Sequence, residues 1–250
     1  MTERKLRVAI FGATSAIAAE VARLYAGRGA RLFLAGRDPA KLRALVDAHG
    51  DAVADFLEVD LTEPDAAAFS VSVALDALGG LDVAVIAHGL LGDQLASERD
   101  VAEAERIIDT NFLSVVALLV PLGNHFEAAG GGHIAVMSSV AGDRGRPRNY
   151  TYGAAKGALN IYLQGLRTRL WSRGVGVHTL KLGPVDTPMT ATHAKNPLFA
   201  RVDTVAAGIV QAIDAGWAEA YVPWFWRPIM AVVRHLPERV LQGLPALSGR

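Results

Sequence analysis

The pattern with the clearest chemical meaning is a tyrosine and a lysine four residues apart, Tyr152 and Lys156. Four residues is about one helical turn, so the phenol and the ammonium are expected on one face of a helix. A nearby cation lowers the pKa of a phenol from its reference value of about 10. The pair therefore predicts a group that exchanges a proton with an alcohol or a ketone near neutral pH. Tyr150 is a poorer candidate, because it lies off the face that carries Lys156.

The elements that must position this pair alternate between strand-like and helix-like segments. Short aliphatic or β-branched runs predict strands, and segments with helical periodicity lie between them. This alternation predicts an α/β fold, a single-domain, Rossmann-type, doubly wound parallel sheet of about seven strands with helices on both faces. The strands are expected near 6–11, 31–35, 53–59, 82–87, 133–138, 175–182 and 220–222, and the helices near 16–28, 39–49, 64–78, 98–129, 151–172 and 202–215.

A turn rich in small residues joins the first strand to the first helix. Small side chains and the free N–H groups of a helix N-terminus are typical of a pyrophosphate cradle. The usual pattern has three glycines, and here Ala16 and Ala18 replace two of them, so an ordinary strand–helix turn is the alternative. The residues expected against a dinucleotide are Gly12, Thr14, Ser15, Ala16 and Ile17.

The second strand ends at Arg37 and Asp38, where the adenosine ribose of a dinucleotide is expected. An arginine at this place favours a 2′-phosphate, whereas a carboxylate favours a free hydroxyl. Since Arg37 comes first and Asp38 is suited to cap the helix that starts at Pro39, NADP(H) is preferred. NAD(H) remains possible through Asp38, and Arg37 could instead be a solvated surface residue.

The composition narrows the function classes further. The formal net charge is zero, so we expect no DNA or RNA partner. The chain has no cysteine, which excludes disulfides, thiol catalysis and Cys-ligated metal. The seven histidines are scattered, so no metal site is predicted. With no signal-peptide pattern and no uncharged run of membrane-spanning length, a cytoplasmic protein is expected.

Further motifs follow the later strands in the same order. They are Asp60-Leu61, Ala87-His88-Gly89, Asn111, Ser138-Ser139 and the segment from Gly183 through Val185 to Thr187. Together with the cradle and with Tyr152 and Lys156, these landmarks resemble the short-chain dehydrogenase/reductase family over about residues 6 to 190. The chain departs from the family pattern at the two alanines of the cradle, at Ile86-Ala87-His88-Gly89, and at Leu182.

The resemblance implies a role for each landmark. Tyr152 would be the general acid or base, and Lys156 would lower its pKa and hold the nicotinamide ribose. Ser139 would bind the substrate oxygen, and Asn111 would position the lysine through a water. The cofactor contacts implied are Asp60 and Leu61 beside the adenine, Ala87, His88 and Gly89 after the fourth strand, and Gly183, Val185 and Thr187 near the nicotinamide amide.

Several of these roles have structural alternatives. Asn111 could bond its own helical turn, a common fate of asparagine. Ser138 could face the site in place of Ser139, because adjacent strand residues point to opposite sides. His88 could be a packed or capping histidine.

Two segments bear on the substrate. Arg144 and Arg148 lie in the loop between Ser139 and Tyr152, where guanidinium groups could clamp a phosphate or carboxylate, although a solvated basic loop is equally expected. Residues 217–250 form an apolar, aromatic C-terminal extension of the single domain 1–250, with three of the four tryptophans and interspersed arginines. This extension could be a lid over the site, a subunit interface or a peripheral membrane contact.

These features predict an NADP(H)-dependent oxidoreductase acting on a small-molecule or lipid-linked ketone or alcohol. The extension and residues 87–93 are similar to a branch of the family that reduces a keto-sugar joined through phosphate to a polyprenyl lipid. Another apolar ketone (a lipid, a steroid or an acyl compound) is the alternative substrate, and a catalytically silent NADP(H)-binding protein is the alternative class. The family resemblance also implies a homodimer or homotetramer.

Overall fold

The computed structural model describes residues 5–191 and 195–243, which fold around one parallel sheet. The strand order is β3-β2-β1-β4-β5-β6-β7, with the switch point between β1 and β4. The prediction of a doubly wound sheet of about seven strands is thus confirmed. The strands are β1 (Arg7–Phe11), β2 (Arg31–Gly36), β3 (Val53–Glu58), β4 (Val83–Ile86), β5 (Gly132–Ser139), β6 (Val175–Leu182) and β7 (Glu219–Val222).

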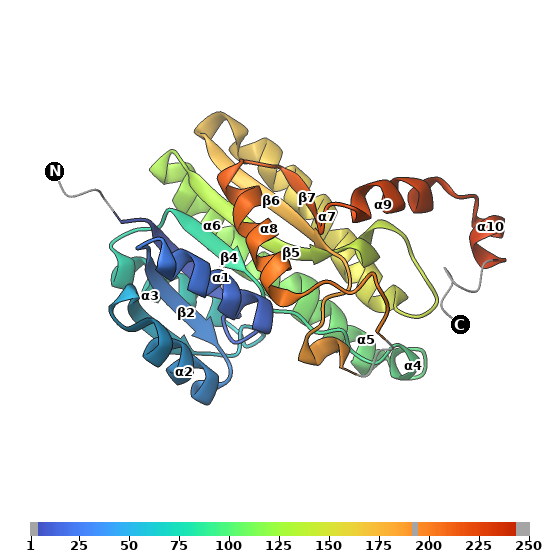
Figure 1. The fold of residues 1–250 in the computed structure, drawn as a ribbon, viewed down its shortest axis with the longest axis horizontal. Helices are drawn as coiled ribbons and strands as arrows, with labels where there is room; N and C mark the ends of the chain where they lie inside the picture. Colours follow the sequence, from blue (N-terminus) through green and yellow to red (C-terminus); the bar gives the residue numbers. More distant parts are fainter. Residues whose placement is uncertain (1–4, 192–194, 244–250) are drawn as a thin grey trace.

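Helices cover both faces of this sheet, because the central strands are apolar on both sides. In β1, Val8 and Ile10 face one hydrophobic cluster while Ala9 and Phe11 face the other. The first cluster lies under α1 (Ala16–Gly27), α2 (Pro39–His49) and α8 (Val202–Asp214). The second lies under α3 (Ala66–Leu78), α6 (Ser114–Ala129) and α7 (Tyr150–Leu170). Figure 1 shows α1 and α8 side by side on one face.

The predicted long helix 98–129 is interrupted. It consists of α5 (Val101–Ile108), a wide π-helical turn (Asp109–Leu113) and α6, and a separate short helix, α4 (Gln94–Ser97), precedes it. The stretch Val101–Ala129 is long and apolar enough to cross a membrane by length and composition. Its buried side chains, such as Leu118 and Leu122, pack in the second cluster, so it serves as a core helix of this domain. The helix expected to start at Pro64 begins at Ala66 instead, because Asp65 adopts a left-handed conformation.

The chain beyond β7 forms two short helices, α9 (Trp226–His235) and α10 (Glu238–Gln242). Figure 1 shows them leaving the end of the sheet next to β7. The apolar side of α9, with Trp226, Met230 and Val233, packs against Val140, which follows β5 directly. The apolar face of this part of the extension is therefore occupied by the domain itself.

Candidate active site

The tyrosine and lysine lie on the first turns of α7, as the spacing predicts. Lys156 is 3% exposed, and its Nζ donates to the carbonyl of Met137 at 3.0 Å. The same nitrogen lies 5.8 Å from the centroid of the Tyr152 ring. The two side chains thus share one helix face at the C-terminal edge of the sheet, where ligands bind in open α/β folds.

Of the two serines that end β5, Ser139 lies on the side of Tyr152. Burial raises the pKa of the Tyr152 phenol, and the nearby Ser139 hydroxyl lowers it by a smaller amount. The Ser139 Oγ also accepts from the Ala141 N–H at 3.1 Å. Ser138 is buried and donates to Oδ1 of Asn160 at 2.6 Å. Adjacent strand residues point to opposite sides. Ser139 therefore lies on the side of Tyr152, whereas Ser138 binds Asn160 of α7.

The expected effect of the lysine on the phenol is not found in this structure. Burial raises the pKa of Tyr152 to about 12 and lowers the pKa of Lys156 to about 8. The lysine Nζ is engaged with a backbone carbonyl and lies over the ring, and desolvation outweighs its charge. The net pKa shift of Tyr152 is therefore upward in this structure, because burial dominates, and not downward as expected from the lysine alone.

Asn111 lies in the wide turn between α5 and α6 and is completely buried. Its Nδ2 donates to the carbonyls of Leu90 (2.6 Å) and Ile107 (2.8 Å), and its Oδ1 accepts from the Leu90 N–H at 3.1 Å. It therefore bonds its own turn and also fixes the segment after β4. A Cβ on Gly89 would lie 2.9 Å from Oδ1 of Asn111 and 3.6 Å from Nζ of Lys156, so this segment runs close to the lysine.

The turn after β1 has the close backbone approach that a dinucleotide cradle requires. Gly12 has φ of +84°, and a Cβ there would lie 2.5 Å from the backbone nitrogen of His88. Ser15 caps α1 by accepting from the Ala18 N–H at 3.1 Å, and Ala16 and Ile17 form its first turn. Thr14 lies against Gly36 at the end of β2. A Cβ on Gly36 would lie 2.9 Å from Cγ2 of Thr14. These residues fit a dinucleotide pyrophosphate at the α1 N-terminus.

His88 is neutral, and its tautomer follows from its neighbours. The Ser114 Oγ donates to the carbonyl of Thr110 at 2.9 Å, so it accepts from the Nε2–H of His88 at 2.8 Å. Burial, together with the charges of Lys156 and Arg37, lowers the pKa of His88 to about 3. His88 is thus a packed histidine, which was the alternative to a cofactor contact. Its buried Nδ1 is an acceptor without a partner among the described residues. Ala87, just before it, packs at the rim of the first cluster.

Arg37 and Asp60 meet at the ends of β2 and β3. Their closest charged atoms are 3.4 Å apart, and the Arg37 side chain is 67% exposed, which leaves it free to turn toward a ligand. Burial alone would raise the pKa of Asp60. Hydrogen bonds from Thr62 and Arg37 have the larger combined effect, so the pKa of Asp60 is lowered. Asp38 caps α2 by accepting from the Lys41 N–H at 3.1 Å, as expected. Leu61 is buried in the second cluster, so its side chain belongs to the core.

The segment after β6 lies under the C-terminal extension. A Cβ on Gly183 would lie 1.9 Å from Nε1 of Trp226, so the indole packs directly on this glycine. Val185 is buried in the first cluster, and Thr187 begins a short turn in which Thr190 Oγ1 donates to the carbonyl of Val185 at 2.6 Å. The sequence alone gives no signal for the contact between Trp226 and Gly183, because the two residues are 43 positions apart.

The three arginines of the loop between Ser139 and Tyr152 have different environments. Arg144 donates to the carbonyl of Arg234 in α9 at 3.4 Å, and Arg148 is exposed. Arg146, which was not selected from the sequence, is the more buried one. Burial lowers its pKa, the nearby charge of Arg148 adds to this effect, and its Nε has no hydrogen-bond partner within the described residues. Arg146 lines an open cleft of about 550 Å³ with Glu98, Gly145, Pro147, Tyr150 and Glu238.

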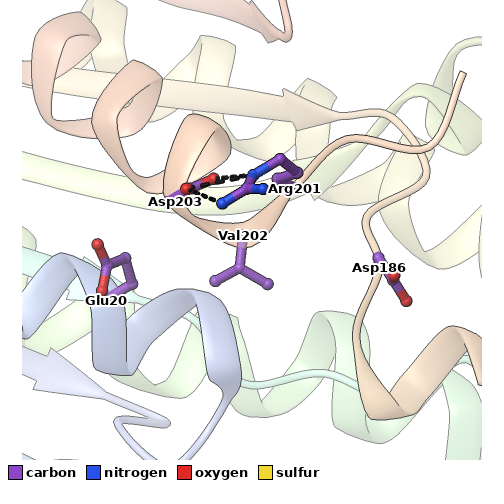
Figure 2. A pocket seen from close by; sticks show the side chains of 5 residues that line it. All are labelled: Glu20, Asp186, Arg201, Val202 and Asp203. Carbon is purple, nitrogen blue, oxygen red and sulfur yellow. Dashed lines mark hydrogen bonds and ion pairs between the residues drawn. The ribbon is translucent and has the colours of Figure 1, made fainter.

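A second open cleft, of about 350 Å³, lies between α1, the segment after β6 and the start of α8. Figure 2 shows its lining, in which Arg201 is paired with Asp203 while Glu20 and Asp186 lie on opposite sides. Three of its five lining residues are carboxylates, which do not suit a pyrophosphate.

Comparisons with known proteins agree with this geometry. A family model described as short chain dehydrogenase matches residues 7–197. The uncharacterized oxidoreductase Rv2073c of Mycobacterium tuberculosis is 35% identical over 95% of this chain and 96% of its own. An uncharacterized oxidoreductase of Streptomyces coelicolor is 32% identical over 94% of each chain. Among solved structures, a short-chain type dehydrogenase/reductase from Mycobacterium ulcerans has a similar fold, with a TM-score of 0.77 at 21% identity, covering 88% of this chain and 89% of that one.

Proposed function

Because the chain belongs to the short-chain dehydrogenase family, we propose that it interconverts a ketone and a secondary alcohol with NADP(H), with Tyr152 as the proton donor or acceptor. The family makes the chain an oxidoreductase that acts on CH–OH groups with NAD(P). The observation that carries the proposal is the position of Tyr152 on the same helix face as Lys156, whose Nζ lies 5.8 Å from the ring centroid. Ser139 is close enough to lower the pKa of the phenol, against the larger effect of burial. These three side chains meet at the C-terminal edge of the sheet, beside the Gly12 turn.

In this proposal the residues of the chain handle one oxygen atom and its proton. The bound nicotinamide supplies the hydride. Tyr152, with a pKa of about 12, is protonated at neutral pH and donates to a ketone oxygen. Ser139 supplies a second hydrogen bond to the same oxygen, where negative charge develops. Once Tyr152 has lost its proton, the ammonium of Lys156 stabilises the phenolate. Asn111 holds the Leu90 backbone that runs close to this lysine.

The preference for NADP(H) over NAD(H) rests on Arg37. Its guanidinium is exposed at the end of β2 and makes only a 3.4 Å contact with Asp60. A 2′-phosphate is a stronger partner for a guanidinium than a shared exposed carboxylate is. Asp38, the residue that would otherwise favour NAD(H), is engaged in capping α2.

For the substrate, we propose an apolar ketone, with a keto-sugar linked through phosphate to a polyprenyl lipid as the sharpest candidate. The resemblance of the tail to the decaprenylphosphoryl-2-keto-erythropentose reductases supports it, and so do the aromatic extension near Val140 and the arginines of the loop. It would imply a flavin-dependent oxidase as partner and a cytoplasmic enzyme working beside the membrane. The alternative is an acyl or other lipid ketone. A solved structure named as a candidate betaketoacyl-ACP reductase supports it, with a TM-score of 0.75 at 25% identity.

A homodimer or homotetramer is also proposed. Large apolar side chains are exposed on the outer faces of α5, α6 and α7, where they would be covered in an assembly. These side chains are Val101, Ile108, Val120 and Ile161. Light scattering in solution would give the mass of the assembly, and a monomer would contradict this part of the proposal.

The test of the function compares the wild-type protein with Tyr152→Phe against a panel of aryl, acyl and sugar ketones. Oxidation of NADPH is followed by absorbance, and NADPH binding is followed by fluorescence. We expect the variant to lose turnover by a factor of about 10² to 10⁴ while it binds NADPH as the wild type does. Equal turnover in both proteins would refute the role of Tyr152. Binding of NADPH without turnover of any ketone by the wild type would favour a silent regulatory protein.

A further inference from the structure

A second cluster of charged side chains adjoins the candidate site, at the turn that follows Ser139. Asp143 ends the short helix η3 (Val140–Asp143), four residues after the serine. Its carboxylate accepts from Nζ of Lys181 at 2.7 Å and from the hydroxyl of Tyr221 at 2.6 Å. The side chains of Asp143 and Lys181 are each 4% exposed. This buried pair joins η3 to β6, and the hydrogen bond from Tyr221 also joins η3 to β7.

The same cluster is tied to the C-terminal extension. Glu219 in β7 is the second carboxylate on Lys181, at 2.9 Å. Arg234, a residue of α9, lies close enough to Tyr221 and Asp143 for both to raise the pKa of its guanidinium. The backbone of α9 in turn accepts from Arg144, the residue after Asp143. Polar contacts thus connect α9 to the end of the turn at Asp143 and Arg144, and Val140 at the other end packs against the apolar side of α9.

On its other side, η3 is packed tightly against the helix that carries Tyr152 and Lys156. A Cβ on Gly153 would lie 2.8 Å from the carbonyl of Ala141, and one on Gly142 would lie 2.7 Å from the backbone of Lys156. The Ala141 N–H donates to Ser139 Oγ. Any shift of η3 would therefore move the serine hydroxyl and press on the turns of α7 that hold the other two catalytic side chains.

We propose that Asp143 is a positioning residue that, through Lys181 and Tyr221, couples the C-terminal extension to the orientation of Ser139. The role of Ser139 rests on the proposed function, but the coupling itself is a property of the fold. A carboxylate this deeply buried is stable only while its partners stay in place, so it has one preferred geometry. The extension thereby becomes a structural part of the active site, in addition to any role it has as a wall of the substrate cleft.

The experiment compares Asp143→Asn with the matched variant Asp82→Asn. Asp82 pairs with Arg7 at 2.8 Å at the opposite end of the sheet, before β4. Both variants weaken an ion pair, but only Asp143→Asn loosens η3. We expect Asp143→Asn to reduce kcat by about tenfold or more with NADPH binding unchanged, because small misplacements of catalytic groups are costly. Asp82→Asn should lower the melting temperature with kcat preserved.

Hydrogen–deuterium exchange gives a readout that does not depend on turnover. In Asp143→Asn, the amides of residues 140–149 and of α9 should exchange faster together, while those of β1 and β4 should not change. If the exchange of α9 is unaffected, the coupling is refuted even when the enzyme is active. If the exchange changes as expected but no ketone is reduced by the wild type, the proposed function fails and the coupling stands.

A double variant, Asp143→Leu with Lys181→Met, separates positioning from stability. Replacing a buried pair by apolar side chains restores stability in many proteins. We expect a double variant that folds as stably as the wild type but remains slow. Full activity in this stable double variant would overturn the proposal, because η3 would then be positioned by packing alone.

Discussion

Two regions of this protein each bury one lysine to the same extent, and they treat its charge in opposite ways. Lys156 and Lys181 are both 3% exposed. Lys156, beside Tyr152, has a backbone carbonyl as its hydrogen-bond partner, and burial lowers its pKa to about 8. Burial acts in the same direction on Lys181, but hydrogen bonds and charge from Asp143 and Glu219 outweigh it and raise the pKa.

The difference separates a region arranged for chemistry from a region arranged for stability. A buried ammonium without a carboxylate destabilises the folded protein, so its presence points to a function in binding or catalysis. A buried ammonium with two carboxylates is compensated and holds strands and turns together. The two lysines are thus expected to respond to the same substitution with opposite changes in stability.

The largest effect is expected for Lys181→Met. The substitution leaves Asp143 buried beside the Tyr221 hydroxyl without its cation, so the free energy of unfolding should fall by about 3–5 kcal/mol. Urea denaturation measures this change. A loss of less than about 1 kcal/mol would mean that Lys181 is no better compensated than Lys156, and the comparison would fail.

Lys156→Met is expected to have the opposite effect on stability. The pKa of Lys156 falls from 10.5 to about 8 on folding, so removing the charge should raise the free energy of unfolding at pH 7 by roughly 3 kcal/mol. Between about pH 8 and 10.5 the unfolded chain binds the proton and the folded protein does not, so the wild type gains stability as pH rises. The advantage of the variant should therefore be largest below pH 8 and shrink above it.

Thermal unfolding of both proteins from pH 6 to pH 10 checks this sign. Lys41→Met, which removes an exposed partner of Asp38, is the control and should change little at any pH. A stability difference between Lys156→Met and the wild type that grows with pH would contradict the assignment of an uncompensated ammonium to Lys156.

A smaller effect is expected at the cofactor end of the site. Arg37→Gln should weaken NADPH binding by about 10- to 100-fold, since hydrogen bonds to charged groups contribute about 1.5–3 kcal/mol. NADH binding should change little. Arg43→Gln, which removes a charge from the neighbouring helix α2, is the matched control, and fluorescence titration with both cofactors measures each constant. If both variants lose the same NADPH affinity, the loss comes from the reduced positive charge of this region and not from a specific contact of Arg37.

Tyr221→Phe is expected to be the mildest of these changes. It removes one hydrogen bond to Asp143 and leaves the ion pair with Lys181 intact. The free energy of unfolding should fall by about 1 kcal/mol, which chemical denaturation resolves. A loss as large as that of Lys181→Met would show that the tyrosine, rather than the ion pair, holds this region together.

Much of the fold and part of the site were predictable from local pattern. The alternation of strands and helices, the cap at Asp38 and the shared face of Tyr152 and Lys156 all follow from spacing along the chain. The sign of the Tyr152 pKa shift was not predictable, because it depends on how deeply packing buries the phenol. The wide turn at Asn111 was missed for a similar reason, since the helical periodicity continues through it.

Contacts between segments that are distant in the chain could not be predicted from the sequence either. Asp143, Lys181 and Tyr221 each look like ordinary residues of a loop or strand until β5, β6 and β7 are aligned. Trp226 was recognised as part of an aromatic extension, but its place on Gly183 depends on how the extension folds back. The burial of Arg146 could not be predicted, because burial within a basic loop has no local signature.

The most direct test of the central claim follows a labelled hydrogen through the reaction. The wild type is incubated with NADPH carrying deuterium at both C4 positions and with the best ketone of the panel, and the alcohol is analysed by mass spectrometry. We predict one deuterium on the carbinol carbon, formed by the wild type and lost in Tyr152→Phe at equal cofactor occupancy. An alcohol without deuterium, or equal label transfer by the variant, would contradict the account.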